Sequence, residues 1–280
     1  MAICEYCGKP APLFKKHHPV CEKKFLEDKD TIVRICQWVV RRDQGMDSLP
    51  SQLQGAIGFH EQPTGKLREL VIESWEQSAA EFLAAHLLTK GEEAVLGIFR
   101  ETFELTPEEL DRKGLYSRVV RSAILRTLIH RSIPETSEPP GEFESELEQG
   151  ERIIFHFGNT GRFHTGRVAE VPPIPEGSRV RLGAGSYLKP DSFEGRLISE
   201  LAIERTDSGE AALTDRGFRF NGVDGAMMIP LSAVAGVIGF GDGIGLVFKE
   251  AGRGTDYYII GDGWFAYNLV VNLLRVAKAG

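Results

Sequence analysis

The stretch Cys4-Glu5-Tyr6-Cys7, followed by Lys15-Lys16-His17-His18-Pro19-Val20-Cys21, decides how the N-terminus of this chain folds. A Cys-x-x-Cys pair places two thiolates on one turn, at the separation that a tetrahedral Zn²⁺ requires. Gly8 follows Cys7 where the chain must turn sharply and a Cβ would be in the way. A histidine and Cys21 form a second pair, so the spacing predicts a zinc site.

The predicted ligands are three thiolates and one imidazole, from Cys4, Cys7, His18 and Cys21. We favour His18 over His17 because His18-x-x-Cys21 repeats the spacing of the first pair; His17 is the alternative ligand. Four protein ligands leave no position for water, so the zinc would be structural rather than catalytic. Cys21 opens a helical pattern, where the helix dipole should favour its thiolate form. The alternative interpretation is a group of thiols without metal.

Size and composition are those of a folded protein with more than one domain. The chain has 280 residues, of which 42% are hydrophobic and 26% are charged. It contains no apolar run of about 18 residues, so no transmembrane helix is expected. Met1 to Cys4 lacks the features of a signal peptide. Three of the four cysteines belong to the zinc pattern, which favours a reducing, cytoplasmic location.

Charge is distributed unevenly along the chain. The net charge is −7, which argues against nucleic-acid binding by the whole molecule. Residues 1–42, however, contain nine Lys or Arg and five acidic residues, an excess of four positive charges. The lysines nearest the predicted zinc site are Lys15, Lys16, Lys23 and Lys24. They would permit contact with nucleic-acid phosphates, although a solvated helix face is the simpler interpretation.

The remaining patterns predict an α+β multidomain protein. Its expected parts are a zinc-binding knuckle and helix (1–44), a helical domain (51–133), a linker rich in proline, glycine and acids (134–150) and a β-rich domain (151–280). Helices are expected at 22–42, 66–88, 94–103 and 116–130, and an amphipathic helix at 263–277. Cys36 lies on the apolar face of the first helix, so we expect it in the core.

The helical domain resembles the small TerB-like domains of tellurite-resistance proteins. The resemblance rests on Leu88-Thr89-x-x-Glu92-Glu93 and on Phe103-x-Leu105-Thr106-x-x-Glu109-Leu110. It implies a helical bundle. Lys90 and Gly91 stand where several acids would be needed for a metal-binding loop, so no metal site is carried over. Thr106-Pro107 with Glu109 is a helix start with a capping box.

The β-rich domain resembles the bacterial PH/GRAM-like group. The matching residues are Ala212-Leu213-Thr214-Asp215-x-x-Phe218-x-Phe220-x-Gly222, Ile229-Pro230-Leu231-x-x-Val234, Asp242-Gly243-Ile244 and Asp262-x-Trp264-Phe265-x-Tyr267-Asn268-Leu269. The resemblance implies a small β-barrel capped by the C-terminal helix, and a role in binding lipid or peptide. A basic phosphoinositide pocket is not evident. Gly239 to Gly243 has no helix after it, so we interpret it as a turn between strands rather than a phosphate loop.

The sequence is compatible with three functions. A zinc-ribbon-like knuckle, a helical bundle and a PH-like domain favour a non-enzymatic cytoplasmic adaptor that binds protein partners. A nucleic-acid-binding protein is the alternative, and it predicts binding that weakens strongly with salt. An HNH-like, metal-dependent nuclease would use His17 as its base, but the downstream Asn and second His of that pattern are missing. No catalytic residue is therefore predicted.

Overall fold

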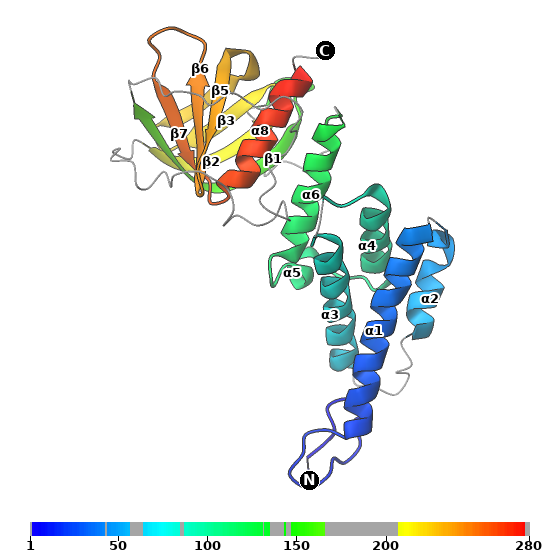
Figure 1. The fold of residues 1–280 in the computed structure, drawn as a ribbon. Coiled ribbons are helices and arrows are strands. Elements are labelled where there is room, and N and C mark those ends of the chain that lie inside the picture. Colours follow the sequence, from blue (N-terminus) through cyan, green and yellow to red (C-terminus); the bar gives the residue numbers. More distant parts are fainter. Residues whose placement is uncertain are drawn as a thin grey trace. The chain divides into compact units, whose positions relative to one another are not determined.

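The computed structural model describes residues 2–42, 44–56, 64–84, 87–130, 132–134, 143, 147–165 and 207–277. The chain is built of two compact units, Met1–Ala123 and Ile124–Gly280. The first is helical and the second is organised around a β-sheet, so the predicted α+β class is confirmed (Figure 1). The finer division into knuckle, helical domain, linker and β domain stays a prediction. No helix in the described part of the chain is long and apolar enough to cross a bilayer.

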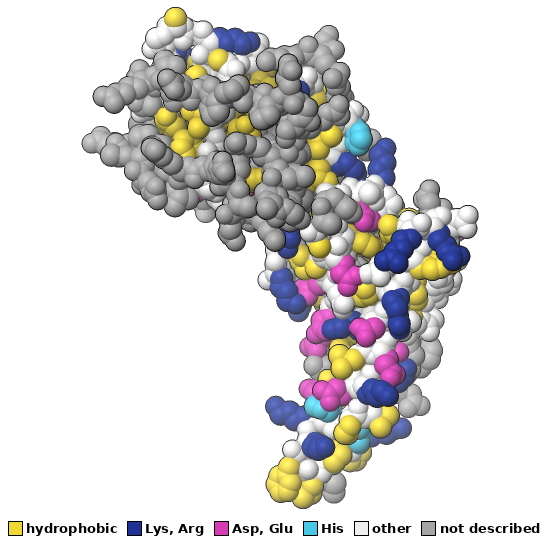
Figure 2. Space-filling model, in the orientation of Figure 1, with side chains coloured by type: hydrophobic (Ala, Val, Ile, Leu, Met, Phe, Trp, Pro, Cys, Tyr) yellow, Lys and Arg dark blue, Asp and Glu magenta, His cyan; other side chains and the backbone are white. Residues whose placement is uncertain are grey.

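Helix α1 organises the first unit. Its helices are α1 (Pro19–Arg42), the 3-10 turn η1 (Met46–Ser48), α2 (Leu49–Ala56), α3 (Thr64–Phe82), α4 (Lys90–Thr102) and α5 (Pro107–Leu110). Helix α6 (Leu115–Ile129) begins in this unit and ends in the second. Helix α1 packs against α2, α3 and α4. Its buried face includes Cys36, which is 0% exposed, as predicted. Burial raises the pKa of the Cys36 thiol to about 12. On the face drawn in Figure 2, side chains of both charge signs are distributed over this unit.

Two helix boundaries differ from the predicted ones. The break expected at 43–50 contains η1 and the start of α2, because Leu49 is buried and Pro50 is tolerated in a first helical turn. Helix α3 ends at Phe82 rather than continuing to Leu88. The Leu88 N–H donates to Ser122 Oγ of α6 over 2.8 Å, a tertiary contact that has no signal in the helical periodicity.

Capping boxes define the starts of two helices. At α5, Thr106 accepts from the Glu109 N–H and the Glu109 carboxylate accepts from the Thr106 N–H, as predicted. Thr89 and Glu92 make the same pair of bonds at α4. Each box satisfies two backbone donors that have no partner within the helix.

Within the described residues of the second unit, seven antiparallel strands form an open sheet (Figure 1). Their order in the sheet is β4-β3-β2-β1-β7-β6-β5. The elements are β1 (Ile153–Thr165), β2 (Asp207–Thr214), β3 (Gly217–Gly222), β4 (Gly225–Pro230), η4 (Leu231–Ala233), β5 (Val234–Gly239), β6 (Gly243–Phe248), β7 (Thr255–Ile259) and α8 (Gly263–Ala277). The strand expected at 152–157 is the first part of the longer β1. Strands expected at 178–188 and 200–205 lie outside the described residues.

Helix α8 packs on β5 and β6 and has the predicted bounds. Its first residue must be glycine because a Cβ on Gly263 would lie 1.9 Å from the Phe240 carbonyl oxygen. Phe240 belongs to the turn that joins β5 to β6, which confirms that this glycine-rich stretch is a turn between strands. From α8, Phe265 packs edge-on against Phe155 of β1, with ring centroids 4.8 Å apart.

Part of the predicted linker belongs to the core of the second unit. Phe143 is 0% exposed and clusters with Ile153 and Ala212. Glu148 accepts from the Arg216 guanidinium over 2.6 Å. Phe143 is therefore a core residue, although it lies within the segment expected to be a linker. The segment is rich in acids and prolines, and such a composition does not indicate that one of its aromatic residues is buried.

Candidate metal centre

The ligand cluster is built by two short segments. Cys4 and Cys7 lie on the N-terminal loop, His18 directly precedes α1, and Cys21 lies in its first turn. Hydrogen bonds to Cys4 shape the loop: the Cys4 N–H donates to the Lys9 carbonyl over 2.8 Å, and the Gly8 N–H donates to the Cys4 carbonyl over 2.9 Å. Gly8 has a φ of 68°, a conformation that favours glycine, as the sequence predicted.

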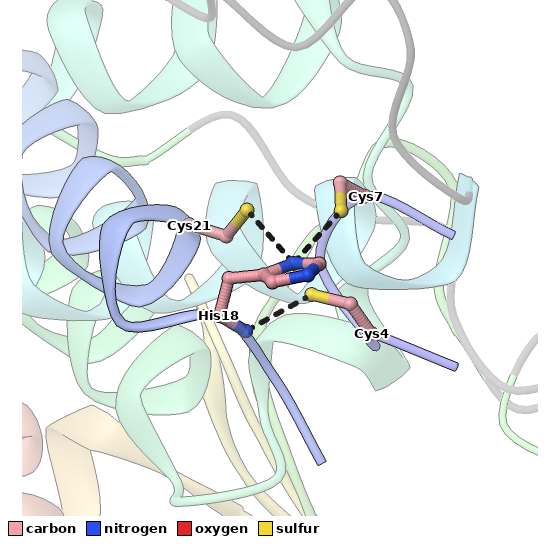
Figure 3. Close-up of side chains that lie close together, drawn as sticks. All are labelled: Cys4, Cys7, His18 and Cys21. Carbon is pink, nitrogen blue, oxygen red and sulfur yellow. Dashed lines mark hydrogen bonds between the residues drawn. The ribbon is translucent and has the colours of Figure 1, made fainter. Parts of the chain in front are cut away.

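The four side chains converge on one point (Figure 3). The ligand atoms of Cys4, Cys7, His18 and Cys21 all lie within 4.8 Å of one another. His18 Nδ1 is 3.4 Å from the Cys7 sulfur and 3.7 Å from the Cys21 sulfur. Tetrahedral bonding to one Zn²⁺ requires an N-to-S separation of about 3.6 Å. The four residues could therefore hold a metal ion, and none of these cysteines forms a disulfide.

The orientation of the His18 ring answers the question of which histidine faces the cluster. His18 Nε2 lies 3.0 Å from the Pro10 carbonyl oxygen. A proton on Nε2 satisfies that oxygen and leaves the Nδ1 lone pair directed at the thiols. Such a second hydrogen bond is what fixes the tautomer of metal-ligating histidines. The backbone N–H of His18 also donates to the Cys4 sulfur over 3.5 Å.

His17 is held by carboxylates instead. Its Nδ1 lies 3.3 Å from Glu5 and its Nε2 lies 3.1 Å from Glu22. The ring of Tyr6 packs edge-on against it, with centroids 5.5 Å apart. Both ring nitrogens therefore lie beside carboxylates outside the ligand cluster, although Nδ1 is buried and makes no hydrogen bond within the described residues.

The thiols differ in their acidity. Burial would raise the pKa of Cys4, but hydrogen bonds from the backbone N–H groups of His18, Tyr6 and Cys7 outweigh it and lower the pKa to about 6. Burial and the neighbouring sulfurs of Cys7 and Cys4 raise the pKa of Cys21 to about 11. In the metal-free protein the expected effect of the helix dipole on Cys21 is thus overcome. A bound cation would reverse this repulsion, because it stabilises all three thiolates together.

The lysines beside the cluster fall into two pairs. Lys23 and Lys24, on α1, form ion pairs with Glu27 at 3.5 Å and with Asp28 at 3.2 Å. Lys15 and Lys16 are exposed, and within the described residues neither has an ion pair. The predicted basic face therefore consists of two paired lysines on α1 and of Lys15 and Lys16, which have no ion pair among the described residues.

The sheet contains charged contacts between strands that no sequence motif indicated. Asp256 of β7 is 1% exposed and accepts from His164 of β1, whose Nδ1 lies 2.6 Å away. Arg162 lies 3.5 Å from the same carboxylate. His156 lies 3.1 Å from Glu210 of β2. Each pair joins neighbouring strands, so only the strand register brings the partners together; in the sequence each histidine is isolated.

No family model, curated protein or solved structure matches this chain.

Proposed function

We propose that this chain is a non-enzymatic adaptor whose N-terminal knuckle is stabilised by one structural Zn²⁺ and whose β domain binds a protein partner. Three thiolates and one imidazole form a soft donor set that suits zinc. The same four ligands fill a tetrahedral sphere, so the ion would have no open position for a substrate. The metal then stabilises the fold and does not catalyse a reaction.

A nuclease is not favoured by the surroundings of the cluster. A general base must reach the proton that it removes. The candidate base, His17, has one ring nitrogen beside Glu5 and the other beside Glu22. A direct test incubates the full-length protein with plasmid and Mg²⁺. Cleavage that disappears in His17→Ala would replace the adaptor proposal with the nuclease.

The PH-like identity of the β domain belongs to this proposal. It is supported by seven antiparallel strands followed by one helix that packs on the sheet. That helix begins with the aromatic residues Trp264 and Phe265, which the resemblance requires at this place. The TerB-like identity of the helical part rests on its sequence motifs alone.

The observation that carries the binding role is strand β5, which ends the sheet among the residues that the structure describes. Strands at a sheet edge offer unpaired backbone groups and are usually protected by charge, proline or bulges. The sequence of β5, Val234 to Gly239, contains neither a charged residue nor proline. Its one irregularity lies between Val234 and Gly236, and Val237 to Gly239 pair regularly with β6. The other edge strand, β4, ends in Pro230. An extended peptide from a partner can therefore add to the sheet beside β5.

The test uses two matched variants of the full-length protein. Ala235 and Ala226 are both exposed alanines on edge strands, on β5 and β4 respectively. Peptides are first selected against the wild-type protein from a random phage library, and their dissociation constants are then measured. Ala235→Lys should weaken binding of the selected peptides at least about tenfold, because a charged residue on an edge strand opposes pairing with another strand. Ala226→Lys should leave binding unchanged. Equal effects of the two variants, or no selected peptide, would contradict the proposal.

A further inference from the structure

The loop between the two halves of the ligand cluster is exposed, apolar and basic. Gly8 to Lys16 contains three lysines and no acidic residue. Leu13 is 79% exposed and Phe14 is 100% exposed. Figure 2 shows hydrophobic side chains at this end of the helical unit, with Lys and Arg side chains close by. Adjacent large hydrophobic residues in full contact with water contribute nothing to the stability of this fold.

Phe14 also has an unfavourable backbone conformation. A turn over Pro12 to Lys15 is closed by a hydrogen bond from the Lys15 N–H to the Pro12 carbonyl over 3.0 Å. Phe14 occupies the third position of that turn with a φ of 65°, where glycine is preferred. No packing compensates for the strain, since the side chain is wholly exposed. Strained residues that the fold itself does not need are candidates for binding.

Lys15 and Lys16 set the charge of the surface that this turn would meet. They follow Phe14 directly, and within the described residues neither forms an ion pair. An occupant that covers the turn must therefore combine an apolar phase with negative charge.

We propose that this turn docks on an anionic lipid membrane, with Leu13 and Phe14 inserted among the lipid headgroups and Lys15 and Lys16 against the phosphates. Apolar residues beside lysines are the combination that binds the membrane interface. Lysine stems can lie along apolar surface while their ammonium groups stay at the headgroups. The surface goes beyond the proposed adaptor role and would bring the adaptor to a membrane without a spanning helix.

The composition of the surface favours lipid over single-stranded nucleic acid. Nucleic-acid sites of this kind stack successive bases on aromatic side chains. Of the large hydrophobic residues exposed between positions 2 and 20, only Phe14 is aromatic. The others are aliphatic: Ile3 (66% exposed), Leu13 (79%) and Val20 (77%). Transfer of aliphatic side chains into a hydrocarbon phase is favourable, and they have no flat face on which a base could stack.

The experiment measures co-sedimentation of the zinc-loaded, full-length protein with lipid vesicles. One set of vesicles is phosphatidylcholine alone, and the other is an equimolar mixture with phosphatidylserine. Phe14→Gly is the informative variant because glycine suits the turn, so lost binding cannot be assigned to lost folding. Val223→Ser removes another exposed apolar residue, 84% exposed against 100% for Phe14, from the second unit and serves as the matched control.

Wild-type protein should bind the anionic vesicles and bind neutral ones more weakly. Phe14→Gly should weaken binding about tenfold or more, and Lys15→Ala and Lys16→Ala about fivefold each. Val223→Ser should bind like wild type. No sedimentation at high lipid concentration, or equal binding by Phe14→Gly, would overturn the proposal. Binding of a single-stranded oligonucleotide without vesicle binding would replace it with a nucleic-acid site. Metal content, measured on the same samples, separates failure of this proposal from failure of the zinc proposal.

Discussion

Replacing one ligand of the cluster should remove both the metal and the order of the N-terminal knuckle. In Cys7→Ser, a hydroxyl that stays protonated stands where a thiolate is required. We expect the full-length variant to lose its zinc and residues 2–18 to become disordered. The helical unit should stay folded because α1 also packs against α2, α3 and α4.

The free energy that zinc must supply follows from the other interactions that could order residues 2–18. Fixing residues 2–18 costs about 17 kcal/mol at the lower limit of backbone entropy. Five backbone hydrogen bonds within the stretch contribute about 5 kcal/mol. Cys4 is its only fully buried residue, so hydrophobic burial adds little. The remaining deficit of about 12 kcal/mol lies within the range that a structural zinc supplies.

Metal analysis and amide hydrogen exchange of the full-length protein test this expectation. Cys36→Ser is the matched control, since it makes the same chemical change at a thiol that lies in the helical core. It should destabilise the helices yet retain one zinc per chain. Equal zinc and equal protection of residues 2–18 in wild type and Cys7→Ser would refute the reasoning.

Three further predictions concern the second unit. Burial would raise the pKa of Glu151, but hydrogen bonds from Arg219 and neighbouring groups lower it to about 2. The ionised Glu151 therefore stabilises the fold above its unfolded pKa, near 4.3. This stabilisation is lost as the pH falls towards 2. Denaturant midpoints measured across this range should decrease for wild type and change less for Glu151→Gln. Phe143→Ala should cost about 3–5 kcal/mol in urea unfolding, whereas a solvated linker residue would cost almost nothing. Gly263→Ala should lower the thermal midpoint of this unit, because its Cβ would lie 1.9 Å from the Phe240 carbonyl oxygen; an unchanged midpoint would show that the helix start can shift without cost.

The sequence by itself determined the features that depend on neighbours within a few turns of chain. The spacing of Cys4, Cys7 and Cys21 predicted a cluster that the structure does bring together, because two ligands with two residues between them meet on one turn. Thr106 with Glu109 marked a helix start for the same local reason. Helix α8 was predicted with its full length because its apolar periodicity is continuous from Gly263 to Ala277.

Only the tertiary structure decided which groups distant in sequence meet. His17 and His18 are neighbours in the chain, and their different roles follow from Pro10 at one ring and from Glu5 and Glu22 at the other. Asp256 meets His164 through the register of β1 against β7, which no sequence pattern encodes. The residue type of Phe14 likewise did not indicate that it is exposed in a turn with a positive φ. Hydrophobic periodicity reports which face of an element is buried, whereas ring orientation, strand register and the exposure of a loop depend on partners that the folded chain alone supplies.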